Sequence, residues 1–227
     1  MDISFEKEYE HMEASVIFSH VDHTLLKAVS TTEEVMALCR EAIAHQTASV
    51  CIPPRFVKAV KEAFGEQLTI CTVIGFPLGY NTTAVKVAET ADAVANGADE
   101  IDMVVSLGDV KEGRFDAVTE EIRAIKAACG GKLLKVIIET CYLTESEKIA
   151  LCRSVSEGGA EFIKTSTGFG TGGATLADIE LFKQHIAPGV KIKAAGGIRT
   201  REDMEHFLEM GCDRIGTSGA VYALTKG

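Results

Sequence analysis

Short apolar segments alternate with longer amphipathic segments along almost the whole chain. The short segments are rich in Val and Ile and are bounded by Gly or polar residues, which is typical of β-strands. They predict eight strands, at residues 16–23, 47–52, 68–75, 98–105, 132–139, 160–166, 190–196 and 212–218.

The longer segments repeat their apolar residues every three or four positions, as amphipathic helices do. Several of them begin with Thr or Asn, whose side-chain oxygens cap helix N-termini. The pattern predicts helices at residues 31–45, 54–64, 81–96, 115–129, 144–157, 175–186 and 201–210.

Eight strands that alternate with helices in a chain of 227 residues predict a parallel (β/α)₈ TIM barrel. A doubly wound open sheet is the structural alternative. No proline- or serine-rich linker interrupts the alternation, so we expect residues 1–227 to form a single domain. Residues 1–14 precede the first predicted strand, and we expect them to form a short N-terminal helical extension.

The composition excludes several classes of function. The formal net charge is −10 at pH 7, which argues against binding to nucleic acid or to an anionic membrane surface. No apolar run approaches the roughly 20 residues that span a bilayer, and the acidic N-terminus is unlike a signal peptide. The seven cysteines form no CxxC pair and indicate free thiols in a reducing compartment. We therefore expect a cytoplasmic protein.

A weak internal repeat places candidate functional residues at one level of the predicted barrel. A helix-ending glycine, a small residue, an acidic residue and a strand follow one another in GADEID, GAEFIK and GCDRIG. Aligning the three segments puts Asp102, Lys164 and Gly216 at the same step. These positions lie toward the carboxyl ends of their strands, the rim where such barrels keep their active sites.

Charged residues occur within predicted strands, where barrel interiors usually hold Val, Ile or Leu. Singly, each is compatible with solvation or with a structural ion pair; Lys135 and Glu139, on one face of their strand, could simply pair with each other. Together they indicate the kind of cluster of acids and amines that supports catalysis. The six residues are Asp22, Asp102, Lys135, Glu139, Lys164 and Lys193.

Lys164 and Lys193 are the most informative members of this set. They lie on the sixth and seventh predicted strands, whose backbones would be about 5 Å apart in a barrel. A neighbouring cation and partial burial both favour the neutral amine, which attacks carbonyl groups to form Schiff bases. Asp102, on the fourth strand, is expected across the interior, where it could move protons directly or through water.

Glycine-rich loops follow the last three predicted strands. In barrels of this type, loops after strands seven and eight form a phosphate site from backbone N–H groups. Glycine also serves to end helices, but two such loops at adjacent strand ends favour a phosphate site. The candidate phosphate-binding residues are Gly168, Gly196, Gly197, Arg199, Gly216, Ser218 and Gly219.

At this point six motifs, in order over nearly the whole chain, resemble the deoxyribose-phosphate aldolase family. FIKTSTGF with KAAGGIRT is the most specific pair, and the other motifs fix the register. The motifs are DHTLL (22–26), EIDMV (100–104), KVIIET (135–140), FIKTSTGF (162–169), KAAGGIRT (193–200) and RIGTSG (214–219). The chain length is similar to that of the shorter bacterial and archaeal members.

The resemblance implies a class I aldolase on a TIM barrel that needs no metal or other cofactor. It implies reversible cleavage of 2-deoxy-D-ribose 5-phosphate to acetaldehyde and D-glyceraldehyde 3-phosphate, with a role in nucleoside salvage. Lys164 would form the Schiff base, Lys193 and Asp102 would handle protons, and Asp22 would belong to the proton relay and polar network. The AAGGIR and IGTSG segments would bind phosphate. Family members dimerise, so a homodimer or higher homo-oligomer is implied.

The chain departs from the family pattern at two places. Phe169 stands where some members carry a lysine near the phosphate, so one cationic contact is lost at this position. The chain also ends five residues after Tyr222, whereas some members extend further and end on a tyrosine that assists proton transfer. We do not transfer that role to Tyr222, which is expected in the final helix.

Two other functions remain open on sequence grounds. A transaldolase-like or other phosphosugar aldolase would keep the Schiff base and change the substrate. A non-catalytic phosphosugar-binding barrel would use Lys164 only structurally, although a binding site gains nothing from two crowded amines.

Overall fold

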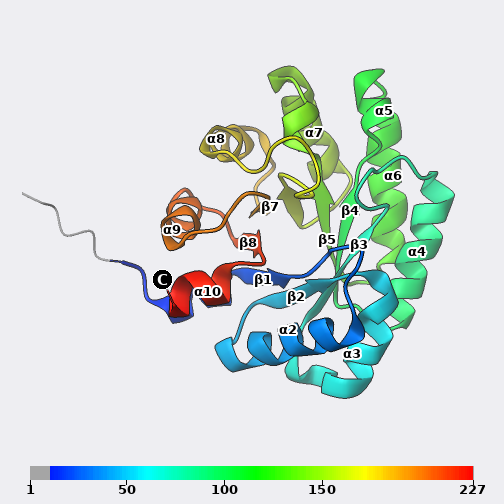
Figure 1. Ribbon diagram of the computed structural model, residues 1–227. Coiled ribbons are helices and arrows are strands. Elements are labelled where there is room, and N and C mark those ends of the chain that lie inside the picture. Colours follow the sequence, from blue (N-terminus) through cyan, green and yellow to red (C-terminus); the bar gives the residue numbers. More distant parts are fainter. Residues whose placement is uncertain (1–10, 227) are drawn as a thin grey trace, which may run out of the picture.

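The computed structural model describes residues 11–226 and forms a closed barrel of eight parallel strands in sequence order. The strand β1 pairs with both β2 and β8, so the sheet has no free edge. Helices surround the strands (Figure 1). The TIM-barrel prediction is therefore confirmed, and the open doubly wound sheet is excluded.

All eight predicted strands are present, and each is shorter than predicted because pairing ends where the chain turns toward a helix or loop. The strands are β1 (Val21–Thr24), β2 (Ser49–Ile52), β3 (Ile70–Ile74), β4 (Glu100–Val104), β5 (Leu133–Ile137), β6 (Phe162–Lys164), β7 (Lys191–Ala195) and β8 (Arg214–Thr217).

The prediction for the first half of the first strand is wrong. Residues 16–19 belong to a short helix, α1 (Ala14–Ser19), which buries Ile17 and Phe18. A short apolar run has no periodicity that separates a buried strand from a buried helical turn. Residues 1–10, most of the predicted N-terminal extension, lie outside the described residues.

The seven predicted helices are all present. They are α2 (Thr32–His45), α3 (Val57–Phe64), α4 (Thr83–Ala95), α6 (Phe115–Ala128), α7 (Glu145–Glu157), α8 (Leu176–His185) and α9 (Arg201–Glu209). Besides α1, the structure has two short helices, α5 (Leu107–Lys111) and α10 (Ala220–Thr225), the second of which is the final helix expected to hold Tyr222. It also has three 3₁₀ turns, at Pro54–Phe56, Gly65–Gln67 and Thr140–Tyr142.

Threonine caps start several of these helices, as the sequence indicates. The side chains of Thr31, Thr144 and Thr200 each accept a hydrogen bond from the backbone N–H three residues later. The carboxylate of the acidic residue at that position accepts a hydrogen bond from the backbone N–H of the threonine in return. This reciprocal arrangement satisfies N–H groups that the helix leaves free. The caps thus fix where each loop at the barrel rim ends.

Strand alternation separates two environments. On β4, Ile101 and Met103 join the core between the barrel and its helices, whereas Glu100 and Asp102 face the barrel interior. On β6, Ile163 joins the core and Lys164 faces the interior. The interior is therefore charged at a level where apolar residues are usual. Within residues 11–226, no helix is long and apolar enough to span a bilayer.

Candidate active site

The centre of the barrel interior is occupied by the Asp102 carboxylate. Its Oδ2 atom lies 2.7 Å from Lys164 Nζ and 2.7 Å from Lys193 Nζ, and its Oδ1 atom lies 2.9 Å from Lys135 Nζ. Asp102 is completely buried, which alone would raise its pKa. The charges of Lys135, Lys164 and Lys193 outweigh burial and hold the pKa of Asp102 well below its usual range. The carboxylate therefore stays ionised.

Lys193 is a neighbour of Lys164, as predicted, because the two residues are paired in register on β6 and β7. Its ammonium lies 2.7 Å from Asp102 Oδ2 and 2.5 Å from Asp22 Oδ2. Burial would lower the pKa of Lys193, but the two carboxylates raise it above its usual value. Lys193 therefore stays protonated and keeps a positive charge beside Lys164.

Asp22, on β1, lies in the same network. Arg214 on β8 donates to Asp22 Oδ1, and Lys193 contacts the other oxygen. Burial would raise the pKa of Asp22, but Lys193, Lys135 and Arg214 lower it below its usual value. Asp22 thus anchors Lys193, whereas the ion pair of Lys164 is made with Asp102.

Lys135 has a different partner from the one considered in the sequence. Its ammonium lies 2.7 Å from Glu100 Oε2, 2.9 Å from Asp102 Oδ1 and 3.2 Å from Cys71 Sγ. Burial would lower the pKa of Lys135, but Asp102 and its other anionic neighbours raise it well above the usual value. Asp22, Cys71 and Glu100 lie close enough together to bind a metal ion, but the Lys135 ammonium lies among them and contacts all three.

Glu139 does not pair with Lys135, because β5 ends at Ile137 and the backbone of Glu139 turns to φ 53°. Its buried carboxylate accepts a hydrogen bond from the Thr167 N–H at 3.1 Å and another from the Thr167 hydroxyl. Glu139 therefore clamps the loop that follows β6. This function was missed because strand alternation does not continue past the end of a strand.

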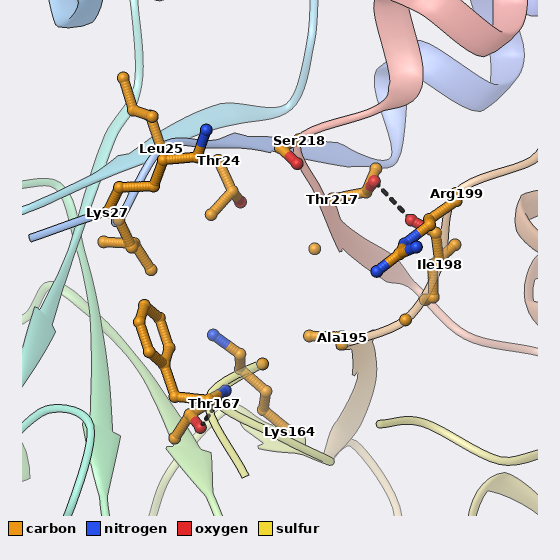
Figure 2. A pocket seen from close by; sticks show the side chains of 16 residues that line it. Thr24, Leu25, Lys27, Lys164, Thr167, Ala195, Ile198, Arg199, Thr217 and Ser218 are labelled. Carbon is orange, nitrogen blue, oxygen red and sulfur yellow. Dashed lines mark hydrogen bonds between the residues drawn. The ribbon is translucent and has the colours of Figure 1, made fainter. Parts of the chain in front are cut away.

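Above the charged network, a pocket opens at the carboxyl ends of the strands, with a cavity volume of about 230 Å³. Lys164 links the pocket to the network, because it lines the pocket (Figure 2) and its amine also bonds to Asp102 below. The sixteen lining residues are Thr24, Leu25, Leu26, Lys27, Lys164, Thr167, Gly168, Phe169, Ala195, Gly196, Gly197, Ile198, Arg199, Gly216, Thr217 and Ser218.

The pocket suits an anion. Among these lining residues, all of them described by the structure, there are three cationic side chains, Lys27, Lys164 and Arg199, and no Asp or Glu. The loop after β7 approaches other backbone closely: Gly196 has φ 85°, and a Cβ built on it would lie 3.1 Å from Gly173 Cα. Only glycine fits such a position without strain. At Gly196 the pocket wall therefore consists of backbone atoms, with no side chain in front of them.

Six of the seven predicted phosphate-binding residues line this pocket: Gly168, Gly196, Gly197, Arg199, Gly216 and Ser218. Gly219 is outside the lining, and its N–H donates to Thr217 Oγ1 at 3.0 Å. Thr217 in turn donates to the Ile198 carbonyl at 2.7 Å, which ties the loops after β7 and β8 together (Figure 2).

Sequence reasoning missed Lys27, which lies in the loop after β1 and lines the pocket. Its signal is its place three residues beyond Thr24, the last residue of a barrel strand. Phe169 lines the pocket as well and packs edge-to-face on Phe76, with ring centroids 5.4 Å apart. Tyr222 is in α10, is 70% exposed and does not line the pocket.

This arrangement can perform nucleophilic chemistry on a carbonyl compound with an anionic group. The Lys164 amine stands at the pocket floor, where a carbonyl carbon could reach it. Asp102, 2.7 Å from its nitrogen, is placed to relay protons to and from it, and Lys193 bonds to the same Asp102 oxygen.

Comparisons with known proteins agree with this chemistry. Residues 16–225 match the family described as DeoC/LacD family aldolase. The chain is 59% identical over 216 residues to a deoxyribose-phosphate aldolase of Clostridium botulinum, covering 95% of this chain and 97% of the relative. It is 57% identical over 202 residues to the enzyme of that name from Clostridioides difficile, covering 89% and 92%. The tetrameric deoxyribose phosphate aldolase structure from Aeropyrum pernix superposes with a TM-score of 0.87 at 32% identity, covering 93% of this chain and 91% of that one.

Proposed function

The chain belongs to the DeoC/LacD aldolase family, and we propose from its site that it cleaves 2-deoxy-D-ribose 5-phosphate reversibly to acetaldehyde and D-glyceraldehyde 3-phosphate. The observation that carries the proposal is Lys164, the one lysine that both lines the anion-suited pocket and bonds to Asp102 among residues 11–226. A pure binding site has no use for a reactive amine at this position.

The reaction begins when the Lys164 amine attacks the C1 carbonyl of the open-chain sugar, while Asp102 relays a proton from the nitrogen to the carbonyl oxygen and ends the step ionised. Addition gives a carbinolamine, and its protonated hydroxyl leaves as water, so that the nitrogen lone pair forms a protonated imine. The iminium is an electron sink for the next step. Lys193 and Lys135 hold the Asp102 carboxylate in place throughout.

The C2–C3 bond then breaks. The C3 hydroxyl loses its proton to Asp102, directly or through water, and C3 becomes the aldehyde carbon of glyceraldehyde 3-phosphate. The bonding electrons move into the iminium and leave an enamine of acetaldehyde on Lys164. A proton returned to C2 gives an iminium again, and water hydrolyses it to free acetaldehyde and the Lys164 amine.

The phosphate group lies at the rim in this proposal, remote from the bonds that change. Gly196, Gly197, Arg199 and Ser218 line the space for it, and we expect their backbone N–H groups, guanidinium and hydroxyl to bind it. Binding of the phosphate holds C1 near the Lys164 amine, and this orientation lowers the activation barrier of the reaction.

A substrate panel tests the assignment. The purified protein is incubated with 2-deoxyribose 5-phosphate, ribose 5-phosphate, or fructose 6-phosphate together with erythrose 4-phosphate as the acceptor aldehyde. The released aldehydes are measured by reduction with NADH-coupled enzymes. We expect acetaldehyde from deoxyribose 5-phosphate, with a kcat/KM at least about a hundredfold above that for either other sugar. Preferential cleavage of fructose 6-phosphate would assign the transaldolase-like chemistry instead, and no cleavage of any sugar would favour the non-catalytic barrel.

We further expect a homodimer or a higher homo-oligomer, since the relative from Aeropyrum pernix is described as tetrameric. Light scattering of the purified protein measures its mass directly against the 24.3 kDa of one chain. The cytoplasmic location stays a prediction.

A further inference from the structure

Two cationic side chains at the pocket rim have no anionic partner. In the part of the chain that the structure describes, neither the Lys27 amine nor the Arg199 guanidinium makes an ion pair or a side-chain hydrogen bond, whereas Lys164 bonds to Asp102. The Glu34 carboxylate accepts its hydrogen bonds from the Thr31 N–H and hydroxyl. Two uncompensated charges at one opening, in a chain of net charge −10, attract an anion.

The backbone that carries Lys27 is fixed. The Leu25 N–H donates to the Cys51 carbonyl at 3.0 Å, and the Ser30 N–H donates to the Lys27 carbonyl at 3.0 Å. Leu26 packs on Val73 and its neighbours inside the barrel mouth. The Lys27 Cα is therefore held at the rim, while the exposed four-carbon side chain is free to turn toward a ligand.

Lys27 also stands beside an uncharged side chain, Phe169, at the pocket mouth. Lys27 and Phe169 line the same two adjacent cavities, so they share one side of the pocket mouth. Phe169 is held by its edge-to-face contact with Phe76 and brings no charge. Figure 2 shows Lys27 and Arg199 on different sides of the opening, with Ser218 between them.

We propose that Lys27 binds the substrate phosphate opposite Arg199 and supplies the positive charge on the side of the pocket mouth where Phe169 brings none. This inference rests on the proposed function and adds a residue that sets the preference for the phosphorylated sugar. Lys27 makes no contact with the reacting carbons in this account, so it contributes to KM and leaves the chemical step to Lys164.

Kinetics with two substrates test the proposal. Lys27→Met is expected to lower kcat/KM for 2-deoxyribose 5-phosphate about tenfold, chiefly through KM, the effect of one lost charge-assisted contact. Cleavage of unphosphorylated 2-deoxyribose should stay within about twofold of the wild type. Inorganic phosphate, as a competitive inhibitor, should bind about tenfold more weakly to the variant.

Two matched variants complete the design. Lys58→Met removes an exposed lysine from α3, outside the pocket lining, and should change neither substrate's kinetics. Adding Phe169→Lys to Lys27→Met should restore part of the preference for the phosphorylated sugar, because it returns a positive charge to the same side of the mouth.

Equal losses for both sugars in Lys27→Met would overturn the proposal and show a structural role, and so would an unchanged KM for the phosphorylated sugar. Either result would refute only the role of Lys27, because the wild-type protein would still cleave 2-deoxyribose 5-phosphate. Absence of that cleavage in the wild type would instead refute the proposed function, so the two failures are distinguishable.

Discussion

Replacing Asp102 by Asn removes the carboxylate that three buried ammonium groups share, with almost no change in shape. The Lys164 and Lys193 amines lie 2.7 Å from one of its oxygens and the Lys135 amine lies 2.9 Å from the other. The interior network has one more cation than anions; in Asp102→Asn the excess becomes two. Its cations are Lys135, Lys164, Lys193 and Arg214, and its anions are Asp22, Glu100 and Asp102.

The magnitude follows from burial. Removing one partner of a buried ion pair typically costs about 3–5 kcal/mol of folding free energy, because the remaining charge is left uncompensated. Asp102 and all three lysines are at most 3% exposed, so solvent does not screen the loss. Without the proton acceptor beside Lys164, kcat for deoxyribose 5-phosphate cleavage should fall by about two to four orders of magnitude.

The pH dependence has a definite sign. The folded-state pKa of Asp102 is held below the unfolded value of about 3.9. Its stabilisation is therefore complete above about pH 5 and is lost progressively as the pH falls through the unfolded-state and then the folded-state pKa. The difference in unfolding free energy between wild type and Asp102→Asn should be equal at pH 7 and pH 5.5.

Urea denaturation at the two pH values, with steady-state kinetics on the same preparations, measures both effects. Asp92→Asn makes the same chemical change on the exposed face of α4 and should alter stability by less than about 0.5 kcal/mol. An Asp102→Asn protein with wild-type stability and wild-type kcat would refute the charge network as described.

Two further substitutions examine the surroundings of Lys164. Lys193→Met should lower kcat about a hundredfold with little change in KM, since Lys193 is buried outside the pocket lining; steady-state kinetics that show the loss in KM alone would contradict this role. Glu139→Gln weakens the two hydrogen bonds that hold Thr167 and should lower the unfolding free energy by about 1–3 kcal/mol, measured in urea. A double-mutant cycle of Glu139→Gln with Thr167→Val that shows no coupling would argue against the clamp.

The sequence predicts those parts of the site that depend on strand order and alternation. Parallel strands that follow one another are neighbours in a closed barrel, so the adjacency of Lys164 and Lys193 is already present in the pattern. Alternation also assigns Asp102 to the interior, where it meets both lysines. The sequence also predicts the loops after the last three strands, because glycine-rich segments follow those strand ends directly.

What the sequence leaves out depends on distances across the barrel and on where strands stop. Alternation places Lys135 inside, but only the closed barrel shows that its partners are Glu100 and Asp102 rather than Glu139. Glu139 itself lies just past the strand, on a left-handed turn that no periodicity reports. For the same reason, Lys27 in an irregular loop was not recognised as a pocket residue.

The central claim is that Lys164 forms the covalent bond with substrate, and trapping with borohydride tests it most directly. The protein is incubated with acetaldehyde and sodium borohydride, digested and analysed by peptide mass spectrometry. The account predicts a two-carbon ethyl adduct on Lys164 in the wild type, and loss of both adduct and cleavage in Lys164→Ala. Full cleavage activity in Lys164→Ala, with no adduct on Lys164 in the wild type, would contradict it.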